Sequence, residues 1–173
     1  MLFLIPARAG STRLPGKNKR LFCGLPLWMW SYATAMRVKS EGDSVMVSTD
    51  DPAIFATALT MDVIASCRPP HLCGDDSSTQ SLIDWVFGDF QCRDSICLLQ
   101  PTSPTREDGL VRKVISIGRQ ARTTTHGVAN GEVYVYYYGV AGWENVESRY
   151  GTDIDTQSDF DHANEVMQAM RFR

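Results

Sequence analysis

The amino-acid sequence predicts an α/β fold with a mostly parallel, doubly wound sheet. Short apolar runs of strand length alternate with segments of helical periodicity along the chain. These runs are apolar throughout, which is typical of parallel strands that helices bury on both faces. Polar loops follow several of them directly, at the edge where such sheets bind ligands. Because the 173 residues contain no repeat, linker or low-complexity tract, we expect one domain over residues 1–173.

Each expected element has its own signal. Continuous apolar or β-rich runs predict strands at residues 2–5, 44–47, 63–65, 96–99 and 133–138. Helical spacing and start signals predict helices at residues 27–37, 52–59, 79–87, 107–119 and 158–170. Pro52 suits a first helical turn, so we expect Asp50 and Asp51 to cap that helix rather than to bind a metal. Ser78 or Thr79 is the expected cap of the helix at 79–87.

Composition and charge limit the possible partners. The net charge is −3, so there is no global basic field for nucleic acid, and any anion site must be local. The five cysteines are odd in number and form no C-x-x-C pair, which argues against a disulfide framework and a zinc site. The N-terminus has no positively charged n-region, its apolar run ends at Pro6, and no run approaches membrane-spanning length. We therefore expect a cytoplasmic protein with free thiols, no nucleic-acid partner and no membrane partner.

The loop at residues 6–18 follows the first strand and superficially resembles a P-loop. The Walker pattern is G-x-x-x-x-G-K-[ST], whereas here Gly10 and Gly16 enclose five residues. Asn18 follows Lys17 at the place where the pattern needs Ser or Thr. Pro15 also removes a backbone N–H from the expected anion nest. These mismatches argue against a P-loop kinase or NTPase.

The same loop still carries the groups that a polyphosphate needs. Arg8, Arg13 and Lys17 are cationic donors, and Ser11 adds a hydroxyl group. The alternative is a solvated basic loop, because basic residues are common on protein surfaces. The position of the loop favours an anion site, since a doubly wound sheet binds its nucleotide after the first strand.

Five stretches, in the same order along the chain, resemble the cytidylyltransferases that activate acidic sugars, the CMP-sialic acid synthetase (acylneuraminate cytidylyltransferase) family. They are IPARAGSTRLPGKN at 5–18, VSTD at 47–50, LLQPTSPTR at 98–106, NGEVY at 130–134 and DIDT at 153–156. The STRLPGK form of the first stretch is also similar to the CMP-Kdo synthetases, so the acceptor stays open between these acidic sugars. The resemblance implies a Rossmann-like fold of the nucleotide-diphospho-sugar transferase type.

The resemblance implies that CTP binds in the opening loop. Its contacts would come from Arg8, Ser11, Arg13, Lys17, Asn18 and Arg68. Arg8 and Lys17 would neutralise the triphosphate during catalysis, and Ser11 would donate to a phosphate. Asn18 would contact the cytosine. For Arg68, a plain surface arginine is an equal alternative.

The reaction implied by the resemblance is nucleotidyl transfer. The anomeric hydroxyl of the sugar acid would attack the α-phosphorus of CTP and pyrophosphate would leave, which requires charge neutralisation and alignment. Mg²⁺ prefers one or two carboxylates plus phosphate oxygens, and Asp153 and Asp155 would face the same way in an extended stretch. The alternative is that both are turn and cap residues before the last helix.

Two further residues are implied on the acceptor side. Gln100 would lie near the sugar acid, or would only bond the backbone of the turn at Pro101. Arg106 would pair with the carboxylate of the acceptor in bidentate fashion, or would simply begin the next helix.

One region departs from the family pattern. The stretch between Arg106 and Asn130 is short, so the family's dimerisation arm would be shortened or missing around residues 107–129. The cations that remain there are Arg112, Lys113, Arg119 and Arg122. The oligomeric state is therefore left open, and the sugar half of the site is reduced. The alternatives to cytidyl transfer are a trimmed non-catalytic nucleotide-binding relative and a nucleotidyltransferase of the same fold with another acceptor.

Overall fold

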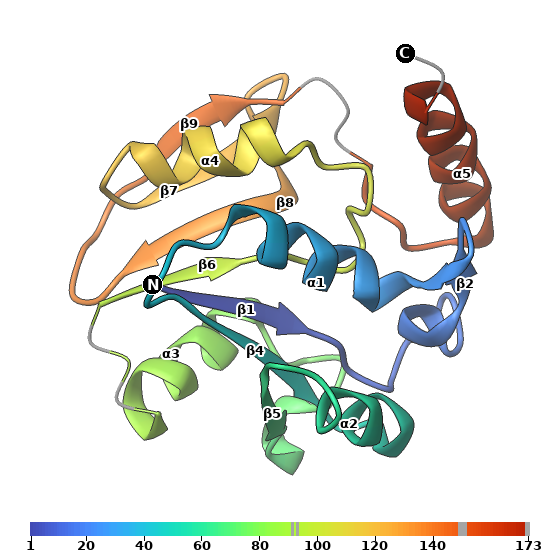
Figure 1. Ribbon diagram of the computed structural model, residues 1–173, viewed down its shortest axis with the longest axis horizontal. Helices are drawn as coiled ribbons and strands as arrows, with labels where there is room; N and C mark the ends of the chain where they lie inside the picture. Colours follow the sequence, from blue (N-terminus) through green and yellow to red (C-terminus); the bar gives the residue numbers. More distant parts are fainter. Residues whose placement is uncertain (91, 93, 149–151, 172–173) are drawn as a thin grey trace.

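The computed structural model describes residues 1–90, 92, 94–148 and 152–171. Its strands are β1 (Leu2–Pro6), β2 (Leu21–Phe22), β3 (Leu25–Pro26), β4 (Ser44–Thr49), β5 (Ile64–Cys67), β6 (Ser95–Leu98), β7 (Ala121–Thr125), β8 (Val128–Tyr137) and β9 (Glu144–Glu147). Within the described residues, the main sheet has the order β5-β4-β1-β6-β8-β7-β9, and β2 and β3 form a separate hairpin (Figure 1).

The first half of the main sheet is parallel, and the second half is mixed. Strands β5, β4, β1 and β6 all run in the same direction. Strand β8 is antiparallel to both β6 and β7, and β9 is parallel to β7. The crossovers that a parallel sheet requires are made by helices, so the predicted α/β class with a mostly parallel sheet is confirmed.

Helices cover both faces of the sheet unequally. One face packs against α1 (Leu27–Val38), α2 (Pro52–Ala58) and α4 (Asp108–Ser116). The other face packs against α3 (Thr79–Asp89), which buries Leu82, Ile83 and Val86. Strands buried on both sides must be apolar throughout, which explains the continuous hydrophobic runs of β1 and β6.

The predicted helix at 107–119 is wrong in extent, and the sequence predicts neither the β2–β3 hairpin nor two strands of the main sheet, β7 and β9. Helix α4 ends at Ser116, and Gly118 follows with φ of +68°, a left-handed conformation that terminates helices. Strands β7 (ARTTT) and β9 (ENVE) have too few apolar residues to give a strand signal. Threonine on β7 is nevertheless buried, as Thr123 and Thr124 show.

The last helix, α5 (Gln157–Arg171), packs at one end of the molecule rather than over the sheet. It lies beside the β2–β3 hairpin (Figure 1), and the rings of Phe160 and Phe22 meet edge to face with centroids 5.6 Å apart. Leu14 of the opening loop joins the same apolar cluster. The segment that precedes α5 is therefore held next to the loop that follows β1. No helix in the described part of the chain is long and apolar enough to cross a membrane.

Polar contacts fix the loop ends at the carboxyl edge of the sheet. Asp51 caps α2 by accepting from the N–H groups of Ala53 and Ile54, at 2.9 and 3.2 Å. Asp50 accepts from the N–H of Ala9 at 2.7 Å, which ties the opening loop to the end of β4. The expected capping role is confirmed for Asp51, whereas Asp50 holds the loop instead.

Candidate nucleotide site

A cavity of about 160 Å³ lies at the carboxyl ends of β1 and β6. Its lining comes from the opening loop, the start of α3 and the turn after β6, together with Arg68 at the end of β5. Of the site residues predicted from the sequence, those in the lining are Arg8, Ser11, Lys17, Asn18, Arg68 and Gln100. Those outside it are Arg13, Arg106, Asp153 and Asp155.

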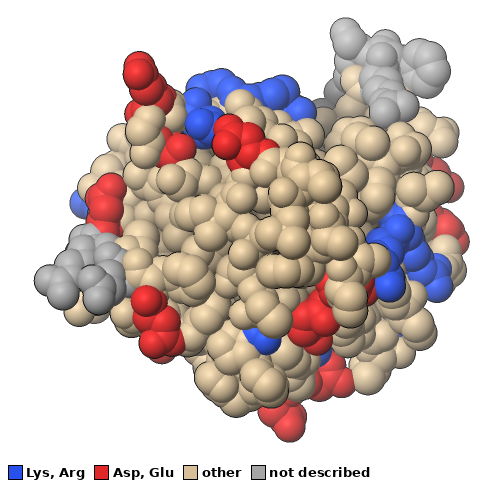
Figure 2. All heavy atoms as spheres, turned by 60° about the horizontal axis from the view of Figure 1, so that its bottom comes forward, with Lys and Arg blue, Asp and Glu red and all other residues tan. Residues whose placement is uncertain are grey.

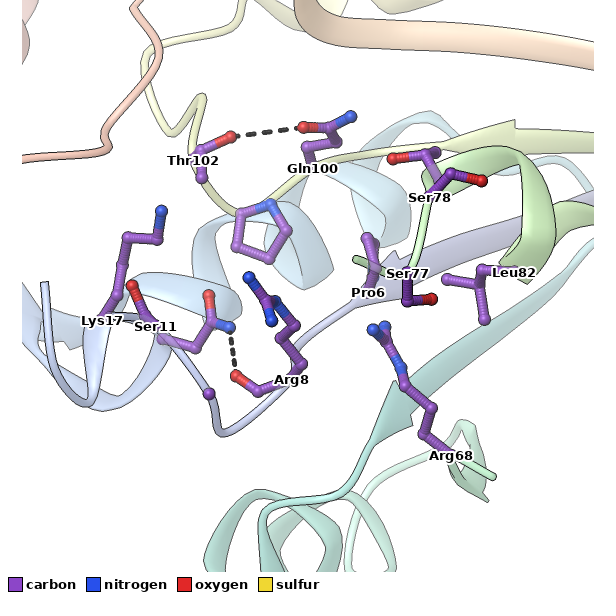
Figure 3. A pocket seen from close by; sticks show the side chains of 14 residues that line it. Pro6, Arg8, Ser11, Lys17, Arg68, Ser77, Ser78, Leu82, Gln100 and Thr102 are labelled. Atoms are coloured by element: carbon purple, nitrogen blue, oxygen red, sulfur yellow. Dashed lines mark hydrogen bonds between the residues drawn. The ribbon is translucent and has the colours of Figure 1, made fainter. Parts of the chain in front are cut away.

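Three cationic side chains reach the cavity from one side. In Figure 3, Lys17, Arg8 and Arg68 stand along one wall, opposite Thr102 and Gln100. On the face drawn in Figure 2, Lys and Arg form small groups among Asp and Glu and make no broad basic patch. The positive charge is therefore local, as the composition required.

Arg68 is the most enclosed of the three cations. It is only 7% exposed, and its Nη2 donates to the Ser48 carbonyl at 3.3 Å. Its Nε is buried and has no hydrogen-bond partner within the described residues. Burial lowers the pKa of Arg68, while the charge of Asp50 opposes that effect. A buried guanidinium with an unused donor at a cavity wall is arranged to receive an anion.

Arg8 is held by the loop that precedes α3. Its Nη2 forms an ion pair with Asp75 at 2.7 Å, and its Nη1 donates to the Cys73 carbonyl at 3.3 Å. Asn18 is buried and donates from Nδ2 to the carbonyl of Arg8 at 2.9 Å. The loop therefore fixes the backbone of Arg8, while an exposed ion pair holds its guanidinium and can exchange partners.

Lys17 connects the opening loop with the segment before α5. Its Nζ donates to the Ile154 carbonyl at 2.7 Å and to Asp155 Oδ1 at 3.0 Å. Arg13, which lies outside the cavity, forms an ion pair with the other oxygen of Asp155 at 2.7 Å. Two cations of the loop that follows β1 thus share the carboxylate of Asp155, which lies far from them in the sequence.

Asp153 belongs to the DIDT segment, which lies beside the turn after β6. The backbone N–H of Ile154 donates to the carbonyl of Thr102 at 2.9 Å, and Thr102 lines the cavity. Burial raises the pKa of Asp153, and the nearby charge of Asp155 raises it further. A hydrogen bond from the side chain of Thr102 acts in the opposite direction, but the net effect is a raised pKa. A carboxylate whose charge is disfavoured in this way gains from a cation beside it.

The side chains that cap α5 are those of Thr156 and Asp159. Thr156 Oγ1 accepts from the N–H of Asp159 at 3.3 Å, and Asp159 Oδ2 accepts from the N–H groups of Thr156 and Asp155, at 2.7 and 3.1 Å. The described residues contain no group of three or more His, Cys, Asp or Glu side chains suited to a metal ion. Two carboxylates suffice for Mg²⁺ when phosphate oxygens and water complete its shell, so the residues present fit that ion.

Arg106 is a buried structural residue in this geometry. Nε donates to the Glu132 carbonyl at 2.8 Å, Nη1 donates to Ser31 Oγ at 2.9 Å, and Nη2 donates to the Gln100 carbonyl. Burial lowers its pKa to about 10, so the side chain still carries its charge near neutral pH. With its donors directed to the protein, Arg106 has no free edge for a substrate carboxylate. It also does not begin a helix, since α4 starts at Asp108.

Sequence reasoning missed the contribution of α3. Ser77, Ser78, Thr79 and Leu82 line the cavity, and Ser78 caps the helix by accepting from the N–H of Ser81 at 3.0 Å. The cap itself was predicted, but its place next to the nucleotide loop was not. The available signal was the Ser-Ser-Thr run after a polar loop, since a helix that follows β5 begins at the ligand-binding edge.

Comparison with known proteins agrees with this architecture. Among solved structures, CMP:2-keto-3-deoxy-manno-octonic acid synthetase complexed with CTP has a TM-score of 0.73 at 17% identity, covering 98% of each chain. Rv0371c of Mycobacterium tuberculosis, solved in complex with manganese, has a TM-score of 0.57 at 13% identity, covering 95% of this chain and 98% of that one. The fold is that of the nucleotide-diphospho-sugar transferases.

The sequence comparisons identify the family. Residues 2–132 match the family model of the cytidylyltransferases, so the chain belongs to the cytidylyltransferase family. It is 38% identical over 122 residues to the CMP-N,N'-diacetyllegionaminic acid synthase of Legionella pneumophila, a match that covers 68% of this chain and 52% of that protein. The chain therefore spans about half the length of this relative.

Proposed function

We propose that this chain transfers CMP from CTP to the anomeric hydroxyl of an acidic sugar of the sialic acid type, with release of pyrophosphate. The observation that carries the proposal is the cavity, where Arg8, Lys17 and the buried Arg68 stand along one wall and Lys17 is paired with Asp155 of the DIDT segment. Such a set can neutralise a triphosphate and bind its metal at the same time. The similarity to a CMP-legionaminic acid synthase favours a nonulosonic acid over Kdo as the acceptor.

The cations would act on the phosphates. Arg8 and Lys17 would exchange their partners Asp75 and Asp155 for the triphosphate, and Ser11 would donate to one of its oxygens. The charge that develops on the departing pyrophosphate would then meet fixed positive groups, as this reaction requires. Arg68 would donate to the same ligand from the end of its guanidinium group, which points toward the cavity.

Asp153 and Asp155 would hold Mg²⁺ at the rim. The ion would neutralise phosphate charge and help to align the α-phosphate with the attacking hydroxyl. Asp155 would become available for this when Lys17 and Arg13 turn to the nucleotide. This exchange gives one carboxylate different partners in the free and the loaded protein.

Asn18 would select the base. Its Nδ2 is already engaged with the Arg8 carbonyl, so its amide oxygen would accept from the exocyclic amino group of cytosine. Uracil lacks that donor, and a buried acceptor left unpaired is unfavourable. CTP should therefore bind better than UTP by about ten- to a hundredfold.

A panel of nucleotides and acceptors tests the proposal. Pyrophosphate release would be assayed with CTP, UTP, GTP and ATP against sialic, legionaminic, pseudaminic and Kdo acids. We expect Mg²⁺-dependent release with CTP and at least one nonulosonic acid. CTP binding without release would favour a non-catalytic relative, and preference for another nucleotide would favour a different acceptor class.

Assembly and location belong to the same proposal. The chain would work without the family's dimerisation arm, because only α4 and the polar turn before β7 occupy residues 107–120. Sedimentation at several protein concentrations would measure its oligomeric state. A cytoplasmic location stays a prediction that rests on the five free cysteines, and fractionation of expressing cells would test it.

A further inference from the structure

Arg122 on β7 is held in place on two sides. Its Nε donates to Asn145 Oδ1 at 3.0 Å, and its guanidinium carbon lies 5.4 Å from the centre of the Trp143 ring. Stacking on an aromatic face leaves the edge of a guanidinium available for a carboxylate. In the described part of the chain, Arg122 forms no ion pair, whereas the nearby Arg119 is paired with Glu144. The orientation of the Arg122 side chain is therefore fixed, and the terminal edge of its guanidinium group is available for a bidentate pair with a carboxylate.

Contacts place Arg122 close to the nucleotide cavity. It pairs in register with Tyr134 of β8, and Tyr134 pairs with Leu98 of β6. Farther along β8 toward the carboxyl edge, Gly131 lies so close to Gln100 that an added Cβ would be 3.3 Å from Gln100 Oε1. Gln100 in turn lines the cavity. A short series of contacts therefore joins the arginine to the nucleotide site.

The hydroxyl of Tyr134 marks the space between the two. Burial raises the pKa of Tyr134, a hydrogen bond from the Gly131 backbone opposes this, and the charges of Arg122 and Asp153 also act on the phenol. Because Arg122 and Tyr134 lie opposite each other in the β7–β8 ladder, their side chains project from the same face of the sheet.

A groove of about 440 Å³ lies beside Arg122, because its lining includes Trp143, the ring on which Arg122 stacks. Gln80, which also lines the groove, directly follows Thr79 of the nucleotide cavity. The lining combines the aromatic side chains of Tyr136 and Trp143 with the polar side chains of Gln80 and Asp84. This volume suits a small ligand, and a lining of both kinds suits a sugar that carries hydroxyl and acyl groups.

We propose that Arg122, oriented by Trp143 and Asn145, binds the carboxylate of the acidic sugar acceptor within a single chain. The inference rests on the proposed function and deepens it. In a 2-keto sugar acid the carboxylate is bonded to the anomeric carbon, so its capture also orients the attacking hydroxyl. The rest of the sugar extends along Tyr136 and Trp143 in the groove.

Binding measurements test this assignment separately from turnover. Calorimetry with Mg²⁺ and a non-hydrolysable CTP analogue would use the four acids of the panel and the methyl ester of the acid that binds best. Arg122→Gln should weaken binding of the acid by about ten- to a hundredfold, because it removes a charge-assisted pair, and should leave ester binding unchanged. Arg122→Lys, which keeps the charge, should weaken it less. Arg119→Gln is the matched control and should change neither.

The outcomes separate the two proposals. Arg122-dependent binding of an acid without pyrophosphate release supports this inference and rejects the proposed function. Equal acid affinity in Arg122→Gln and the unsubstituted chain overturns the inference, and so does an equal loss for acid and ester. Failure of all four acids to bind the unsubstituted chain overturns it as well.

Discussion

Two buried arginines near the cavity show how differently one residue type can be used. Arg106 directs its donors to the protein, at Ser31 Oγ and two backbone carbonyls. Arg68 keeps a buried Nε without a partner among the described residues and faces the cavity. A fully satisfied arginine holds the fold together, whereas a partly satisfied one is prepared for a ligand.

Substitution of the two arginines should separate stability from binding. Arg106→Met should lower the free energy of unfolding by about 3 kcal/mol, because it leaves buried carbonyls without donors. Arg112→Gln is its control, with an expected loss below about 1 kcal/mol for partly exposed bonds. Arg68→Met should weaken CTP binding about tenfold or more with little loss of stability. Urea unfolding and calorimetry measure both quantities, and the reverse pattern would reject this distinction.

Asp51 gives stability a defined pH dependence. Burial raises the pKa of this carboxyl, but the bond from Lys19 and the N–H groups of Ile54 and Ala53 outweigh it, so the pKa lies below the ordinary 3.8. Such a carboxylate stabilises the fold above its ordinary pKa, and the contribution is lost as the pH falls through the lowered value. Asp51→Asn keeps the cap but removes the charge. Its stability deficit at pH 7 should vanish near pH 2, and a constant deficit at both would contradict this assignment.

At the scale of elements, the sequence predicted the parallel half of the sheet well and the second half poorly. Strands β1, β4 and β6 lie where their apolar runs indicated, because burial on both faces leaves a continuous hydrophobic signal. The edge strand β5 is also where it was expected, although it is largely exposed. Strands β7 and β9 are polar, and tertiary pairing rather than local preference makes them strands. The proposed acceptor groove lies at these late strands.

In the candidate site, too, some residues could be predicted from the sequence and others could not. Arg8, Ser11, Lys17 and Asn18 were found because one loop carries them all. The ion pairs of Asp155 depend on contacts between distant segments. A single sequence contains no local signal for such contacts.

Gly131 tests how the sheet supports the site. It has φ of +78°, and an added Cβ would approach Gln100 Oε1 to 3.3 Å. Gly118, with φ of +68° and open space around it, is the matched control. Alanine at either position should cost about 1–2 kcal/mol of stability through backbone strain. Only Gly131→Ala should also raise KM for the acceptor, since Gln100 must move, and equal KM values in both variants would argue against a role for Gln100.

At the scale of the whole molecule, a segment early in the sequence and a segment late in the sequence are in contact at one carboxylate, that of Asp155. Packing of α5 against the β2–β3 hairpin brings Asp155 to Lys17 and Arg13. The free protein thus satisfies internally a carboxylate that we assign to the metal. Binding of the nucleotide and binding of the metal should therefore favour each other. The nucleotide draws Lys17 and Arg13 away from Asp155, which leaves this carboxylate to the metal, and the metal draws Asp155 away from the two cations, which leaves them to the nucleotide.

This coupling can be measured without turnover. Mn²⁺, used as a paramagnetic probe, should bind weakly to the protein alone. When CTP is present, its affinity for the protein should rise by about tenfold or more, after the association of Mn²⁺ with free CTP has been subtracted. Arg13→Gln should increase metal affinity in the absence of CTP, since it removes a competing cation from Asp155. Arg20→Gln, on an exposed neighbour that bonds Gln157, is the control and should have little effect. Lower metal affinity in Arg13→Gln would contradict the exchange.

The central claim is transfer of CMP from CTP to an acidic sugar at this cavity. Its most direct test is the initial rate of pyrophosphate release from CTP with Mg²⁺ and a nonulosonic acid, together with the mass of the sugar product. We expect the product to be a CMP-sugar. In Asp155→Asn we expect the rate of pyrophosphate release to be at least about a hundredfold lower, because a carboxylate that would bind the metal is lost. Absence of product with every acid, in a chain that still binds CTP and Mg²⁺, would contradict it.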